Sequence, residues 1–414
     1  MKKLTLRDVD VKGKRVLMRV DFNVPMEEGK VGDDTRVRAA LPSIKHVLDQ
    51  GGSLVLMSHL GRPKGKGYEA DLSLKPVAEH LGKLLEKTVA FAPDCLKADE
   101  QVAALTPGDV LLLENTRFYK EEEGKVKTDG MSDDEAKAAK TEMKEKQKAM
   151  ARKLASYGDL FCNDAFGSAH RAHASTAVVC QFFDRNVAGF LMEKEIDYLG
   201  RALASPERPF VAILGGAKVS DKVNVIQNLL PKVDALIIGG AMAYTFYRAK
   251  GLPTGTSLVE EDKADLAKDL LAQAEKSGKK FLLPIDHIIG DKFDAAAAVE
   301  TVGEDGIREG WMALDIGPKS VELFCDEVRK AKTVVWNGPM GAFEMKPFAA
   351  GTMAMAKAIS ETDCLSIIGG GDSVSAVNES GVAGKMTHIS TGGGASLEFL
   401  EGKELPGVAA LTDA

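Results

Sequence analysis

The feature that most constrains the fold is a regular alternation between short apolar runs and amphipathic helical patterns, which continues along nearly the whole chain. Short β-rich runs that alternate with helical segments are typical of β-α-β units and of parallel sheets. We therefore expect an α/β fold. In the first half, the expected strands are Arg15–Val20, Ser53–Met57, Val89–Ala92, Val110–Leu113 and Leu160–Asn163.

The second half repeats this alternation. Its expected strands are Phe210–Leu214, Ala235–Ile238, Phe281–Leu283, Thr333–Trp336, Leu365–Ile368 and His388–Ser390. A chain of 414 residues has room for two or three domains. We expect a first domain over residues 1–184, one linking helix over 185–204 and a second domain over 205–398, because the apolar residues of 185–204 follow a helical period and two prolines come after it.

The overall charge argues against two classes of partner. A formal net charge of −7 is unfavourable for binding nucleic acid or a membrane surface. The beginning of the sequence lacks the apolar stretch of a signal peptide. The five cysteines are scattered, as expected for reduced thiols in a cytosol. We therefore expect a cytoplasmic protein. The charged stretch 119–152 is interpreted as a solvated loop followed by a surface helix, without a role in chemistry.

Polar and cationic residues follow the expected strands of the first half. Ligands of open parallel sheets bind beyond the carboxyl ends of the strands, so these residues are expected to converge. The planar guanidinium of arginine suits phosphate and carboxylate oxygens, which predicts a small polyanion as the ligand. The residues at this edge are Asp21, Asn23, Arg36, His59, Arg62, Arg117, His170 and Arg171.

Glycine follows the expected strands of the second half. Glycine lets backbone N–H groups approach a ligand closely, and a helix N-terminus favours phosphate, so these turns predict a nucleotide site. Lys218 and Lys222 are spaced by one helical turn at the expected start of a helix, where both would reach phosphates. Asp372 lies beside a glycine turn and is a suitable Mg²⁺ ligand.

Other catalytic motifs are missing from the sequence. There is no G-x-x-x-x-G-K-[ST] segment, which excludes a P-loop enzyme, and no H-E-x-x-H or G-x-S-x-G. The segment Gly65–Ala70 matches a dinucleotide fingerprint by letter, but it lies in a lysine-rich loop rather than at the start of a helix. An NAD-dependent dehydrogenase is therefore not favoured.

The sequence resembles the phosphoglycerate kinases over essentially its whole length. The resemblance is carried by long ordered segments at the strand ends described above. These are Arg19–Pro25, Ser58–Pro63, Glu114–Phe118, Asn163–Gly167, Ala169–His173, Gly215–Val219, Trp336–Pro339 and Gly369–Asp372.

This resemblance implies two Rossmann-like domains with parallel sheets that face each other across a cleft, and a C-terminal tail, 399–414, that packs back on the first domain. It implies that 3-phosphoglycerate or 1,3-bisphosphoglycerate binds the first-domain residues named above. ADP or ATP would bind the second domain with Mg²⁺ held by Asp372, and Arg36 and Lys218 would be catalytic. The implied nucleotide-binding residues are Gly215, Lys218, Lys222, Gly239, Gly240, Asn337, Pro339, Glu344, Gly370, Gly371, Asp372 and Ser373.

The implied reaction is an in-line phosphoryl transfer in glycolysis or gluconeogenesis, with the two domains closing on their substrates. Both possible nucleophiles, a carboxylate and a nucleotide phosphate, are already anions at neutral pH, so no general base is needed. The alternative is a non-catalytic sensor of adenine nucleotides, which would keep the glycine turns but would not need the arginine set. We expect a monomer.

Overall fold

The computed structural model describes residues 2–414. The chain divides into two compact units. Unit 1 comprises Met1–Asp197 and Glu404–Ala414, and unit 2 comprises Tyr198–Lys403. Helix α5 (Phe190–Ala204) begins in unit 1 and ends in unit 2. Among the described residues, no helix combines the length and the apolar character that crossing a bilayer would require.

Unit 1 is built on a sheet of six parallel strands in the order β5-β6-β4-β1-β7-β8. Because all six run the same way, their carboxyl ends meet at one edge. The bounds are β1 Arg15–Arg19, β4 Ser53–Met57, β5 Ala90–Ala92, β6 Val110–Leu113, β7 Leu160–Asn163 and β8 Asn186–Ala188. A short antiparallel hairpin, β2 Met26–Glu27 and β3 Lys30–Val31, lies outside this sheet.

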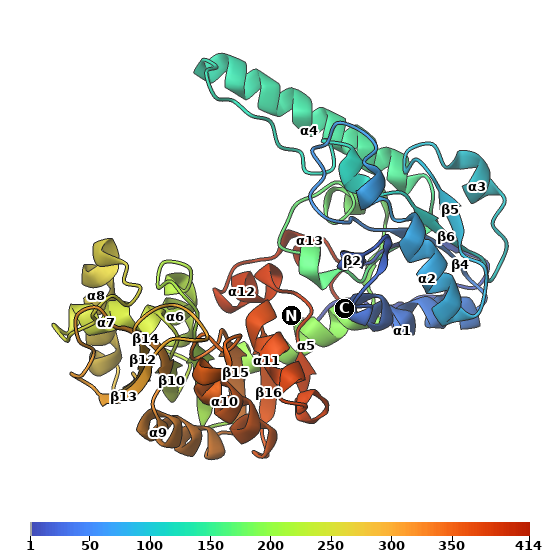
Figure 1. Cartoon of the computed structure of the whole chain (residues 1–414). Helices are drawn as coiled ribbons and strands as arrows, with labels where there is room; N and C mark the ends of the chain where they lie inside the picture. Colours follow the sequence, from blue (N-terminus) through green and yellow to red (C-terminus); the bar gives the residue numbers. More distant parts are fainter. Residues whose placement is uncertain (1) are drawn as a thin grey trace. The chain divides into compact units, whose positions relative to one another are not determined.

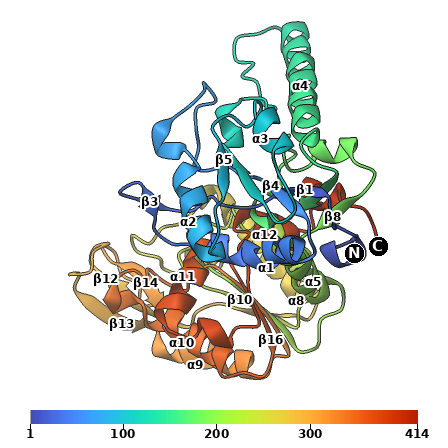
Figure 2. The same ribbon diagram turned by 90° about the vertical axis from the view of Figure 1, so that its right-hand side faces the viewer.

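Both faces of this sheet are covered, because successive strand residues point to opposite sides. On one face, Val16 and Met18 pack with residues of α1 (Thr35–Asp49) and α2 (Lys75–Leu85). On the other, Leu17 packs with residues of α3 (Asp99–Ala103) and α4 (Asp133–Ala155). Such apolar strands, buried on both faces, are typical of parallel α/β sheets. The first part of α4 extends beyond the rest of unit 1 (Figures 1 and 2).

The prediction that a single helix covers 185–204 is wrong at its beginning. Residues Asn186–Ala188 form β8, which pairs in parallel with β7, and α5 starts only at Phe190. Gly189 lies between them and its N–H donates to the carbonyl of Asn163 at 2.9 Å. The backbone hydrogen bonds that Asn186–Ala188 make with the edge of β7 therefore outweigh the helical period of their sequence.

Unit 2 has a second sheet of six parallel strands, in the order β11-β10-β9-β15-β16-β17. Its core includes Val211, Trp336 and Phe324. The prediction of an α/β protein with parallel sheets is therefore confirmed. The strands are β9 Phe210–Leu214, β10 Ala235–Ile238, β11 Lys280–Leu282, β15 Thr333–Asn337, β16 Leu365–Gly369 and β17 His388–Ile389. The helices are α6 Val223–Leu229, α7 Met242–Ala249, α8 Ala264–Lys276, α9 Pro318–Arg329, α10 Ala350–Ser360, α11 Gly371–Glu379 and α12 Gly394–Leu400.

Unit 2 also contains an antiparallel sheet that sequence reasoning missed. Strand β12 (Asp286–Gly290) pairs with both β13 (Val299–Gly303) and β14 (Met312–Ile316). Strand β13 is largely exposed, so it lacks the apolar pattern that identifies a buried strand.

Residues Glu404–Ala414 complete unit 1. Helix α13 (Pro406–Ala409) lies against the end of β7, where the Asn163 amide donates to the carbonyl of Gly407 at 3.3 Å. The chain then runs beside its own beginning: Leu4 N–H donates to Thr412 O at 2.9 Å, and Lys3 Nζ lies 2.7 Å from Asp413 Oδ1. The two ends of the chain are accordingly side by side (Figures 1 and 2).

Candidate functional site

The strand register of unit 1 brings the predicted substrate residues to one edge. Arg19, the last residue of β1, pairs with Met57 of β4 and Asn163 of β7. The segments that begin at Val20, Ser58 and Asp164 therefore leave the sheet together. Strand β6 ends beside β4, which adds the segment from Glu114 onward.

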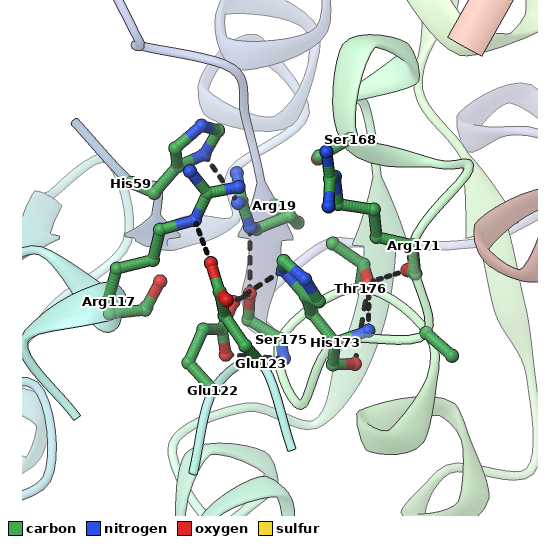
Figure 3. Close-up of polar contacts among 12 residues, drawn as sticks. Arg19, His59, Arg117, Glu122, Glu123, Ser168, Arg171, His173, Ser175 and Thr176 are labelled. Atoms are coloured by element: carbon green, nitrogen blue, oxygen red, sulfur yellow. Dashed lines mark hydrogen bonds and ion pairs between the residues drawn. The ribbon is translucent and has the colours of Figure 1, made fainter. Parts of the chain in front are cut away.

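Arg19 lies at the centre of this edge and is fully buried. Its Nε donates to Ser175 Oγ at 2.8 Å, its Nη2 lies 3.0 Å from His59 Nδ1, and its Nη1 donates to the carbonyl of Val20. Burial lowers the pKa of Arg19, and the negative charge of Glu122 opposes this effect. Figure 3 shows the contacts of Arg19 with Ser175 and His59. Sequence reasoning assigned Arg19 no role, although a charged residue that ends a buried apolar strand indicates a satisfied internal charge.

His59 is the more deeply buried of the two predicted imidazoles at this edge. It is 5% exposed and lies against Arg19. Burial, and then the positive charge of Arg19, hold the pKa of His59 well below its usual range, so the ring is neutral.

Asp21 and Asn23 act on neighbouring groups. Asp21 is 5% exposed, and its Oδ2 accepts from Arg36 Nη1 at 2.8 Å. Asn23 Oδ1 accepts from the Gly61 N–H at 2.8 Å, which fixes the loop that carries Arg62. Both predicted residues therefore lie at the edge.

The remaining predicted cations also gather here. Arg117 Nη1 donates to Gly61 O at 3.0 Å, and its Nε lies 3.6 Å from Glu123. Burial lowers the pKa of Arg117. Arg171 Nε lies 3.1 Å from His170 Nε2, and Arg62 is exposed on its loop. The structure thus leaves exposed guanidinium groups beside a buried, neutral imidazole.

The prediction that residues 119–152 begin as a solvated loop is wrong at Glu122. Its side chain is fully buried and accepts from Ser175 Oγ at 2.5 Å and from Ser175 N–H at 3.0 Å. His173 Nδ1 lies 3.9 Å from Glu122 Oε1, and burial lowers the pKa of His173 to about 3. The rest of the segment is a loop and the surface helix α4, as expected.

In unit 2, the register aligns the glycine turns. Asn337, the last residue of β15, pairs with Leu214 and with Gly369, and Leu214 pairs with Ile238. Gly215 N–H donates to Asn337 O at 3.0 Å, and Gly240 N–H donates to Met340 O at 2.9 Å. These turns therefore support one another at a single edge of the sheet.

Two glycines at this edge are required by the backbone. A Cβ on Gly215 would lie 2.0 Å from the carbonyl oxygen of Pro339, because the two turns touch. Gly370 has φ of +87°, in the region that favours glycine, and precedes the first turn of α11. That turn begins with Gly371, where an added Cβ would meet no atom within 4 Å. Gly371 and Asp372 are both exposed at this helix start.

Lys218 and Lys222 are not one helical turn apart, because α6 begins only at Val223. Both lie in the loop after β9, where Ser220 Oγ and N–H donate to the Glu260 carboxylate at 2.5 and 3.0 Å. Lys222 Nζ donates to Asn337 Oδ1, and burial lowers the pKa of Lys222. Lys218 is exposed. The loop, rather than a helix face, positions the two amines.

Ser373 and Asp372 occupy the first turn of α11. Ser373 is fully buried and its Oγ accepts from Gly338 N–H at 2.6 Å, which joins this helix to the Asn337 turn. Asp372 is exposed at the same helix end. Glu344 is exposed in the loop between β15 and α10, and within residues 2–414 no hydrogen bond or ion pair places it beside the glycine turns.

Comparisons with known proteins cover nearly the whole chain. A family model described as phosphoglycerate kinase matches residues 6–403. The chain belongs to the phosphoglycerate kinase family. Two relatives named phosphoglycerate kinase, from Chloroherpeton thalassium and Koribacter versatilis, are 54% and 55% identical to it, with 100% of each chain covered.

Solved structures of phosphoglycerate kinases have the same fold. The structure from Coxiella burnetii superposes with a TM-score of 0.87 at 37% identity, covering 99% of this chain and 98% of the other. The structure from Pyrococcus horikoshii gives 0.80 at 33% identity, with the same coverage. The predictions of this family and of a kinase are confirmed, and the sensor alternative is not favoured.

Proposed function

We propose that this chain interconverts 1,3-bisphosphoglycerate plus ADP with 3-phosphoglycerate plus ATP. The observation that carries the proposal is the difference between two sheet edges. One gathers arginines and a neutral imidazole, and the other gathers glycine turns and two lysines. A small polyanion fits the first edge, and a nucleoside polyphosphate fits the second.

In unit 1, we assign the phosphoglycerate to the cationic edge. Exposed guanidinium groups of Arg62 and Arg171 are available for the phosphate oxygens, and Arg36 is held in place from one side by Asp21. His59 supplies a neutral donor, and His170 supports Arg171. With these roles, the exposed guanidinium groups make their charge-assisted hydrogen bonds to the ligand rather than to other protein groups.

In unit 2, we assign the nucleotide to the glycine turns. The N-terminus of α11 and the exposed backbone around Gly371 suit the phosphates. Lys218 and Lys222 add positive charge from the loop after β9, and Asn337 holds the second of them. Gly239, Gly240 and Pro339 belong to turns that pack on this loop.

Mg²⁺ fits this edge as an ion carried by the nucleotide. The described residues, 2–414, contain no group of three or more His, Cys, Asp or Glu that would enclose a metal. Mg²⁺ commonly takes one or two carboxylates and completes its shell with water and substrate phosphates. Asp372, exposed at the start of α11, is the carboxylate that would hold it. The ion would neutralise phosphate charge.

The chemical step needs no proton transfer in this proposal. A carboxylate oxygen of 3-phosphoglycerate forms a bond to the γ-phosphorus of ATP, the bond from that phosphorus to the β-phosphate oxygen breaks, and ADP leaves as an anion. Arg36 and Lys218 stabilise the spreading negative charge, which is the main task in phosphoryl transfer. In-line attack requires the two units to close on their substrates.

We further propose that the chain acts as a cytoplasmic monomer. A single chain supplies both sets of ligand groups. All five cysteines are free thiols, as expected in a reducing compartment.

A coupled assay tests the proposed reaction. ADP production from ATP should require both 3-phosphoglycerate and Mg²⁺, and chelating the metal should stop it. The control omits 3-phosphoglycerate. ADP release that does not depend on 3-phosphoglycerate would contradict the proposal and indicate a different acceptor.

A further inference from the structure

A directed chain of buried hydrogen bonds leads from Glu122 to His59 (Figure 3). The Glu122 carboxylate accepts from Ser175 Oγ at 2.5 Å. The same hydroxyl accepts from Arg19 Nε at 2.8 Å, and Arg19 Nη2 lies 3.0 Å from His59 Nδ1. Three of these side chains are fully buried, and His59 is 5% exposed.

The chemistry of the groups fixes the direction of every bond. A guanidinium only donates, so His59 Nδ1 must be an acceptor without a proton. The neutral ring then carries its proton on Nε2. At the other end, Ser175 accepts from Arg19 and must direct its own hydrogen to Glu122. Glu122 Oε1 is therefore the acceptor at the end of the chain.

Glu122 is anchored far more firmly than its neighbours. Its carboxylate also accepts the Ser175 N–H at 3.0 Å, and its carbonyl accepts from Ala174 N–H at 2.9 Å and from Gln147 Nε2 at 3.2 Å. The next residue, Glu123, is instead partly exposed and lies near Arg117. Burying a carboxylate costs free energy unless its oxygens are hydrogen-bonded. Here both oxygens accept from Ser175, whose hydroxyl in turn accepts from Arg19.

We propose that Glu122 is a positioning residue which, through Ser175 and Arg19, holds His59 as the Nε2–H tautomer, so that the ring offers an N–H donor to the anionic substrate. The identity of that substrate rests on the proposed function. The tautomer itself does not depend on it. Glu122 and Ser175 act through Arg19 and His59, and they do not touch the reacting atoms.

The tautomer is measurable by ¹⁵N NMR of the histidine side chains in the full-length protein without substrate. A His59→Gln variant assigns the His59 signal among the seven histidines. The wild type should show a protonated Nε2 and an unprotonated Nδ1 at His59. A protonated Nδ1 in the wild type would overturn the proposal, whether or not any variant folds.

Two variants break the chain at different points. Ser175→Ala removes the hydroxyl relay, and Glu122→Gln removes the charge that orients it. In each, the His59 signal should move toward a mixture of tautomers. Glu121→Gln makes the same charge change at a partly exposed neighbour and should leave the signal unchanged. An unaltered His59 spectrum in a folded Ser175→Ala variant would contradict the relay.

Steady-state kinetics distinguishes a positioning role from a general loss of activity. Because a ground-state contact to the substrate is weakened, KM for 3-phosphoglycerate should rise roughly tenfold in both variants, with a smaller change in kcat and in KM for ATP. A fall in kcat with both KM values unchanged would overturn the positioning role. If the wild type lacks 3-phosphoglycerate-dependent activity, the proposed function fails while the tautomer result still stands.

Discussion

Arg36 Nη1 donates a hydrogen bond to Asp21 Oδ2 at 2.8 Å, and the Arg36 side chain stays 34% exposed although Asp21 is 5% exposed. The buried Asp21 carboxylate thus holds the Arg36 guanidinium from one side. Such a group is oriented before the substrate arrives, which is the condition for stabilising charge that develops during a reaction.

Arg36→Ala should leave the fold intact and lower kcat by roughly 10²–10³-fold, the cost of losing one preorganised donor. Steady-state kinetics and circular dichroism check the two parts. Arg38→Ala, on the same helix, is the control, because Arg38 is paired with Asp34 and largely exposed. Near-normal turnover in Arg36→Ala would show that Arg36 is only a surface charge.

Lys222→Met should weaken ADP binding by roughly ten- to a hundredfold, since a half-buried cation that contacts Asn337 is lost. Binding of 3-phosphoglycerate, measured by calorimetry, should not change. Lys218→Met should lower turnover more than affinity, because Lys218 is exposed and free to follow the transferred group. Lys250→Met is the control, at a lysine paired with Glu304. Loss of 3-phosphoglycerate binding in Lys222→Met, with ADP affinity intact, would reverse the assignment of the two units.

Asp164 should make stability depend on pH. It is fully buried, its Oδ1 accepts from the N–H groups of Leu191 and Met192 at 2.9 and 3.1 Å, and burial raises its pKa from 3.8 to about 7. The folded protein therefore binds more protons than the unfolded chain between pH about 4 and 7, so stability from this group falls as pH rises through that window and is constant above it.

The test compares thermal midpoints of the wild type and Asp164→Asn from pH 4.5 to 8. The variant keeps an acceptor oxygen without the buried charge, so its Tm relative to wild type should increase with pH up to about 7. Asp129→Asn serves as the control for losing one exposed carboxylate. A Tm difference that decreases with pH would show that the ionised form is the stabilised one.

Substrates should draw the two units together. In-line transfer needs donor and acceptor oxygens in contact with water excluded, and α5 is shared between the units. Small-angle scattering should give a smaller radius of gyration with 3-phosphoglycerate and a non-hydrolysable ATP analogue together than with either alone, because only the pair bridges both units. We expect the bending near Gly189 or Gly200, or in the turn Gly392–Gly394. An unchanged radius with both ligands would contradict closure.

The sequence allowed strand positions to be predicted well where a strand is buried on both faces. Strands β4 and β9 have apolar runs and were predicted with the bounds that the structure shows, whereas β1 ends at Arg19, one residue before the predicted Val20. Strand β13 is exposed and β8 is three residues long, and neither leaves such a pattern. Their formation depends on partners distant in sequence.

The candidate site likewise contains residues that the sequence predicts and residues that it does not. Residues just beyond the end of a strand, such as Asp21 and His59, were predicted from position and chemistry. Glu122 was missed because it belongs to a run of exposed charges, and only the tertiary fold buries it against Ser175. Periodicity reports local structure, and a single buried acid within a solvated loop has no local signature.

The packing of Glu404–Ala414 into unit 1 has a consequence for how the protein is made. A ribosome that has released residues up to Lys403 has delivered every residue of unit 2, while unit 1 still lacks the segment that contacts Leu4 and Asn163. The unit encoded first is therefore finished last. During synthesis the contacts of Leu4 and Asn163 with this segment therefore form only after all of unit 2 has been made.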